Sequence, residues 1–148
     1  MAHENCVALM RHQPLLELVD CRAIAQASHQ SADEHQATVS IAIVDAGGHI
    51  LFLERRDGAS PASSEAALAK ARMAGLNGKA TAATEASINS DRPALIQLSG
   101  IFGLPAIAMA GGIPILVNGA CIGAIGVSGM TPDVDSAIAA AGLQALNI

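Results

Sequence analysis

The chain has 148 residues and a mass of 14.9 kDa, the size of a single domain with one sizeable core. With 51% hydrophobic and 14% charged residues it can bury enough apolar surface to fold, which excludes a disordered chain. Only 8 residues are Lys or Arg and the net charge is −5, so binding to nucleic acid or to an anionic membrane is not expected. We expect one domain, residues 1–148, whose partner is a small molecule or a protein.

The sequence gives no sign of a membrane span or of a disulfide framework. Glycines and prolines break its most apolar stretch, residues 101–117, and the first residues lack the basic segment and apolar run of a signal peptide. A soluble, cytoplasmic protein is therefore expected. Cys6, Cys21 and Cys121 form no Cys-x-x-Cys pair, which predicts buried free thiols.

Aromatic residues are almost absent, with no Trp, no Tyr and two Phe. Because aromatic side chains normally supply much of the contact area of a core, stability must come from dense packing of Ala, Gly and Ile. Contacts between subunits would extend that packing, so a homo-oligomer is expected.

Apolar residues recur every three or four positions over residues 12–34, which predicts an amphipathic helix. The β-branched run 38–45 and the run 49–54 follow, joined by Gly47 and Gly48, and predict a β-hairpin because glycine supplies the positive φ of a tight turn.

The second half of the chain alternates between helix and strand patterns. Ser63 or Ser64 is a candidate cap for an alanine-rich helix running through residues 66–73, whereas residues 75–93 predict no firm structure. Three strands are predicted over residues 106–110, 113–117 and 120–128, with Asn118-Gly119 as a hairpin turn. Thr131-Pro132-Asp133 begins a last helix. Hairpin-joined strands covered by helices predict an α+β sandwich on an antiparallel sheet.

Nucleotide and hydrolase motifs are not present. The glycines of residues 123–129 recur at every third position rather than in the G-x-G-x-x-G order, and no Walker lysine follows. Ser128 lies in Gly-Val-Ser-Gly, which is not the G-x-S-x-G elbow, and no histidine follows His49. Gly111 and Gly112 fit two interpretations equally: a strand that allows close backbone approach, or a turn that faces a ligand.

Cations and histidines are the remaining candidates for binding chemistry. Arg55, Arg56, Lys70 and Arg72 make up half of the 8 cations and could converge on a carboxylate or propionate. The histidines have no zinc spacing, so no dedicated metal site is expected. A single histidine can still ligate haem iron, and the candidates are His12, His29, His35 and His49, each of which otherwise reads as a surface or turn residue.

Five motifs in order carry a family resemblance. They are Val44-Asp45-Ala46-Gly47-Gly48-His49, Arg55-Arg56-Asp57-Gly58-Ala59, Ser63 with Lys70-Ala71, Gly111-Gly112-Ile113-Pro114-Ile115, and Gly123-Ala124-Ile125-Gly126-Val127-Ser128-Gly129. In these five motifs the chain resembles the GlcG/HbpS-like haem-binding (haem-degrading) family, which is also found as the C-terminal domain of PduO-type corrinoid adenosyltransferases. Asp135 stands where the family usually keeps an acid.

The resemblance implies an α-β-α sandwich around a five-stranded, profilin-like antiparallel sheet, assembled as dimers up to octamers. It also implies haem as the cofactor. The residues expected to bind the ligand are Arg55, Lys70, Gly111, Gly112 and Ser128.

Three functions stay open at this stage. In the first, the protein binds or handles haem: Arg55 and Lys70 pair with the propionates, and His29, His35 or His49 ligates the iron. In the second, it is an enzyme or binding protein for a small organic acid, with Asp45 or His49 transferring a proton. In the third, it is an oligomeric accessory protein. Whether the protein is an enzyme is left undecided by the sequence.

Overall fold

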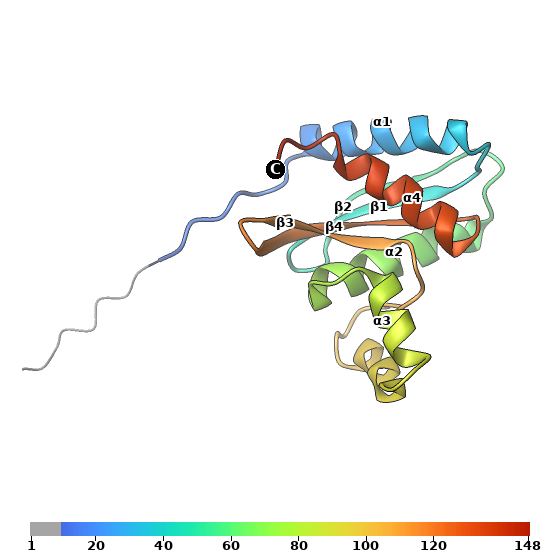
Figure 1. Ribbon diagram of the computed structural model, residues 1–148. Helices are drawn as coiled ribbons and strands as arrows, with labels where there is room; N and C mark the ends of the chain where they lie inside the picture. Colours follow the sequence, from blue (N-terminus) through green and yellow to red (C-terminus); the bar gives the residue numbers. More distant parts are fainter. Residues whose placement is uncertain (1–9) are drawn as a thin grey trace, which may run out of the picture.

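The computed structural model describes residues 10–148 (Figure 1). Four α-helices, one 3-10 helix and four strands are formed within this part of the chain. In chain order they are α1 (Leu18–Glu34), β1 (Ser40–Asp45), β2 (Ile50–Arg55), α2 (Pro61–Asn77), α3 (Thr81–Ile88), η1 (Pro93–Gly100), β3 (Gly112–Val117), β4 (Ala120–Ser128) and α4 (Pro132–Leu143).

The strands form one antiparallel sheet in the order β2-β1-β4-β3. Both predicted hairpins are present. Gly48 closes the first with a φ of 80°, and Asn118 and Gly119 close the second with φ of 50° and 79°. An α+β fold on an antiparallel sheet is therefore confirmed.

The expectation of five strands is wrong for residues 10–148, because the sheet has four. The predicted strand 106–110 pairs with no other strand. Instead, the Ile107 amide donates to the carbonyl of Ala69 on α2, and the Ala110 amide donates to the Glu85 carboxylate on α3. The strand was predicted from its apolar residues alone. In the structure its backbone amides bond to acceptors on helices α2 and α3 instead of to another strand.

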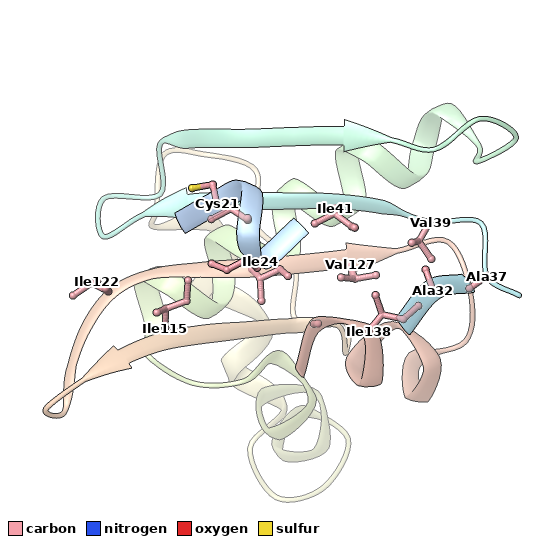
Figure 2. Close-up of a cluster of buried hydrophobic side chains, with 13 residues drawn as sticks. Cys21, Ile24, Ala32, Ala37, Val39, Ile41, Ile115, Ile122, Val127 and Ile138 are labelled. Atoms are coloured by element: carbon pink, nitrogen blue, oxygen red, sulfur yellow. The ribbon is translucent and has the colours of Figure 1, made fainter. Parts of the chain in front are cut away.

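The two faces of the sheet are packed differently. Helices α1 and α4 cover one face over a cluster of branched aliphatic residues that includes Ile24, Ile41, Val127 and Ile138 (Figure 2). Helix α2 covers the other face, where the buried cluster is mostly alanine. A Cβ at Gly126 would collide with the backbone of α2, so glycine in β4 allows the helix to lie directly on the strand.

The helix boundaries differ from the prediction in three places. The first helix begins at Leu18 rather than near residue 12, because Pro14 precedes it and Asp20 accepts the Glu17 amide at the first turn. Helix α2 begins at Pro61 after Ser60, and the Ser63 hydroxyl instead donates to the Ser60 carbonyl. Residues 75–93, left without structure in the prediction, contain the end of α2 and all of α3.

Helix α3 and η1 form a lobe that projects away from the sheet beyond α2 (Figure 1). The predicted C-terminal helix is present as α4, and Thr131 caps it by accepting the Val134 amide. None of the helices described over residues 10–148 has the length and hydropathy needed to cross a membrane.

Candidate functional site

Lys70 and Asp135 form an ion pair inside the protein. Their side chains are 4% and 3% exposed, and Lys70 Nζ lies 3.0 Å from Asp135 Oδ2. Lys70 also donates to the Val127 carbonyl, and the Met130 amide donates to Asp135 Oδ1. The pair therefore ties α2 to the end of β4 and to the start of α4. Partners on both sides offset the cost of burying the two charges.

Three further predicted ligand residues surround this pair rather than an open site. A Cβ at Gly111 would lie 2.5 Å from the Val127 carbonyl oxygen and 3.1 Å from Lys70 Nζ. The Gly112 amide donates to Thr81 Oγ1, and Ser128 is buried at the end of β4. Lys70, Gly111, Gly112 and Ser128 are thus brought together, but in the interior, where close backbone approach explains both glycines.

Arg55 lies elsewhere, in a surface hollow of about 420 Å³ between α1 and the end of β2. The hollow is lined by five polar residues, His29, Glu54, Arg55, Arg56 and Asp57, and is called the His29 hollow below. It holds two of the predicted site residues, His29 and Arg55. The structure therefore places a histidine beside the arginine at the strand end, in a hollow that Lys70 does not line.

The groups of the His29 hollow carry opposite charges at close range. His29 Nε2 lies 3.0 Å from Glu54 Oε1, with the His29 side chain mostly buried and the Glu54 side chain half exposed. Arg56 pairs with Asp33 of α1 and donates to the Ala37 carbonyl. Arg55 makes no ion pair with any residue of the described part of the chain, so its guanidinium can accept an anionic ligand.

Asp45 and His49 lie at the opposite end of β2, in the turn between β1 and β2. Asp45 Oδ1 accepts the amides of Gly47 and His49 and lies 3.3 Å from His49 Nδ1. Burial raises the pKa of Asp45, but these hydrogen bonds outweigh burial, and the pKa falls below its usual value. Five strand steps, roughly 17 Å, separate this turn from Arg55. One small ligand therefore cannot contact both groups.

The other two histidine candidates lie at the end of α1 and in the segment before it. His35 follows the last turn of α1, and its Nδ1 lies 2.8 Å from the Ser31 carbonyl oxygen. His12 is exposed in the segment before α1. Neither lines the His29 hollow.

Sequence reasoning missed two residues of the hollow, Glu54 and Asp57. Arg56 was named only as one of four cations that could converge on a carboxylate, and in the structure it is partly buried and paired with Asp33 of α1. The available signal was the run of four charged residues, Glu54-Arg55-Arg56-Asp57, which directly follows an apolar segment and carries both signs of charge.

The thiols do not add a site. Cys21 is buried in the core, and burial raises its pKa. Cys121 is partly buried in β4, and Cys6 lies outside the described residues. Over residues 10–148 no three His, Cys, Asp or Glu side chains gather as a metal site.

Comparisons with known proteins place these features in a family. The family described as "Haem degrading protein HbpS-like" matches residues 16–144. Protein GlcG of Escherichia coli K12 is 34% identical over 119 residues, covering 80% of this chain and 85% of that protein. A double mutant of Streptomyces reticuli HbpS has a similar structure, with a TM-score of 0.83, 29% identity and full coverage of both chains.

A second solved structure, described as a PduOC complex with haem, has a TM-score of 0.81 and 28% identity. The similarity covers 90% of this chain and 96% of that one. Because the family match spans most of the chain and the same fold recurs over whole relatives, the chain belongs to the HbpS-like family.

Proposed function

We propose that this protein binds haem at the His29 hollow. His29 is the proposed iron ligand, and Arg55 is the proposed partner of a propionate. Two findings support haem as the ligand class: the haem-degrading description of the family and the haem complex of a structural relative. Haem proteins commonly hold iron through a histidine, and guanidinium groups suit carboxylates.

One observation carries the choice of site. Among the described residues, His29 is the histidine that shares a hollow with an arginine free of ion pairs. The competing contact is weak, because Glu54 is half exposed and a surface ion pair contributes only about 0–1 kcal/mol. His29 Nε2 is itself buried, so iron binding requires the Glu54 side chain to turn into solvent and open the way to it.

The proposal gives Lys70 a different part from the one the resemblance implied. Its ammonium group is enclosed and already donates to Asp135 and Val127, so propionate binding falls to Arg55 with Arg56 beside it. Gly111, Gly112 and Ser128 support the buried pair in this scheme rather than contact the ligand.

The test is a titration with hemin followed by visible absorption, on the natural protein and on His29→Ala, His35→Ala and His49→Ala. We expect a saturable Soret shift that is lost in His29→Ala and kept in the other two variants. His49, with its side chain 75% exposed, is the matched control. A response that does not saturate contradicts haem binding, and a loss in His35→Ala or His49→Ala alone contradicts the site.

The lining of the hollow favours a small organic acid as the second candidate. All five lining residues are polar or charged, and a compact carboxylate would bind Arg55 without needing an apolar slot. Chemical protection distinguishes this candidate from haem. If the ligand is a small organic acid, adding it should protect Arg55 from a reagent that modifies guanidinium groups, and hemin should give no specific Soret shift.

A further inference from the structure

Two asparagines of this chain directly precede a glycine, Asn77 and Asn118. Asparagine is a thermolabile residue, because the backbone nitrogen of the next residue can attack its side-chain amide carbon. A following glycine has no Cβ to hinder that approach. The attack also requires the two atoms to come within about 3–3.5 Å of each other, with the nitrogen free of other bonds. Sequence alone makes the two sites equally reactive, so any difference between them comes from the fold.

Asn118 and Gly119 form the exposed turn between β3 and β4, at the tip of that hairpin (Figure 1). Both residues have positive φ, as a two-residue hairpin turn requires. Over residues 10–148, no group accepts a hydrogen bond from the Gly119 amide, and none bonds to the Asn118 side chain. A Cβ at Gly119 would meet nothing within 4 Å, so water reaches the turn. Both reacting groups are therefore free to move toward each other.

Asn77 is held in place at the end of α2. Its Nδ2 donates to Thr84 Oγ1 of α3 at 3.3 Å. The nitrogen that would attack it, the amide of Gly78, donates to the Ala74 carbonyl at 2.9 Å and closes the last turn of the helix. Two hydrogen bonds must therefore break before Asn77 can react. The same dipeptide is thus free at one place in the fold and restrained at the other.

We propose that Asn118 is a site of spontaneous conversion to isoaspartate in the folded protein and that the fold protects Asn77. The Gly119 nitrogen loses its proton to water and forms a bond to Asn118 Cγ, while the Cγ–Nδ2 bond breaks and ammonia leaves with a proton. Water then opens the cyclic imide. Opening at the side-chain carbonyl gives aspartate, and opening at the backbone carbonyl gives isoaspartate. Water is the only co-reactant, and no group is oxidised or reduced.

The two products affect the hairpin differently. Aspartate tolerates the left-handed conformation of position 118 and keeps the turn. Isoaspartate instead carries the backbone through the side-chain carbon, which lengthens a turn that has only two residues. Val117 and Ala120 are the strand pair next to this turn, so they are the first to lose their register. Formation of isoaspartate therefore opens the tip of the hairpin.

The test incubates the natural chain, folded and in urea, in mildly alkaline buffer. Peptide mass spectrometry measures conversion at each asparagine, and an isoaspartyl methyltransferase assay measures total isoaspartate. In the folded chain we expect Asn118 to convert about tenfold faster than Asn77, since two hydrogen bonds protect Asn77. In urea the two sites should convert at similar rates. Equal rates in the folded chain would overturn the proposal. The same rate ratio in urea would overturn it too, because flanking sequence rather than the fold would then set the rates.

Two variants assign the product to its residue. Asn118→Gly keeps a sequence suited to the turn and should lose most of the isoaspartate that the folded natural chain forms. Asn77→Ala is the matched control and should leave that yield unchanged. Hydrogen exchange of the Val117 amide should become faster as the natural chain ages, but not in aged Asn118→Gly. An Asn118→Gly protein that forms as much isoaspartate as the natural chain contradicts the proposed site.

Discussion

Two regions of this protein each hold one of its few cations and use it differently. Lys70 is sealed beside Asp135, where every strong contact is made within the chain. Arg55 lies on the open His29 hollow with no ion pair among the described residues. The small number of cations therefore makes each one a candidate functional residue, but it does not tell which role the residue has. Burial and partners decide whether the charge stabilises the fold or binds a ligand.

Removing one member of the buried pair tests this difference between the two cations most strongly. Lys70→Ala should lower the free energy of unfolding by about 3–5 kcal/mol, because Asp135 keeps a charge in the interior without its cation. Urea unfolding followed by circular dichroism measures the change.

A double variant, Lys70→Met with Asp135→Leu, distinguishes the penalty of an unpaired charge from loss of the pair itself. Replacing both charges by apolar groups of similar size should restore most of the lost stability. If Lys70→Ala costs less than about 1 kcal/mol, as an exposed pair would, the pair does not stabilise the interior as argued.

The glycine beside the pair gives the next largest effect. Gly111 has a φ of 125°, and an added Cβ would press on the Val127 carbonyl oxygen and on Lys70 Nζ. Gly111→Ala should therefore cost about 2–4 kcal/mol through backbone strain and overpacking. Gly100→Ala is the control, since a Cβ there meets nothing within 4 Å. Equal unfolding midpoints for the two variants would contradict a packing role for Gly111.

The sequence predicted the local turns better than it predicted which residues meet across the fold. Both hairpins follow from Gly48 and from Asn118-Gly119, because turn chemistry is a property of a few adjacent residues. The apolar run 106–110 was mistaken for a strand, since only the fold shows that Glu85 takes its backbone donor. That Lys70 meets Asp135 across 65 positions also depends on tertiary packing, which no local pattern reports.

The candidate site shows the same limit. His29 and Arg55 were both identified from residue type, but 26 positions separate them, and their shared hollow arises from α1 lying against β2. The resemblance implied that Lys70 and Arg55 bind the same ligand. In the fold, Lys70 is buried against Asp135 of α4 and does not line the hollow that holds Arg55.

The open region should respond to mutation in the opposite way from the buried one. Arg55→Ala should leave the unfolding midpoint within about 0.5 kcal/mol of the natural chain, because the side chain is exposed. Hemin affinity should fall by about 1–3 kcal/mol if the guanidinium pairs with a propionate. Lys79→Ala removes an exposed cation outside the hollow and should change neither quantity. Unchanged affinity in Arg55→Ala would make Arg55 ordinary surface charge.

Asp45 is intermediate in exposure between Lys70 and Arg55, and we expect its charge to have the smallest effect on stability. Its carboxylate accepts the amides of Gly47 and His49, so its pKa lies below the ordinary value of 3.8. A lowered pKa means that ionised Asp45 stabilises the fold above the unfolded-state pKa, and that this stabilisation is lost as the pH falls through the folded-state pKa. Because the side chain is 40% exposed, solvent screening keeps the contribution below about 1 kcal/mol.

Asp45→Asn keeps an acceptor oxygen but no charge, so its stability should lie slightly below that of the natural chain at pH 7 and converge with it in acid. Parallel stability curves from pH 7 into acid would show that the turn gains nothing from the charge.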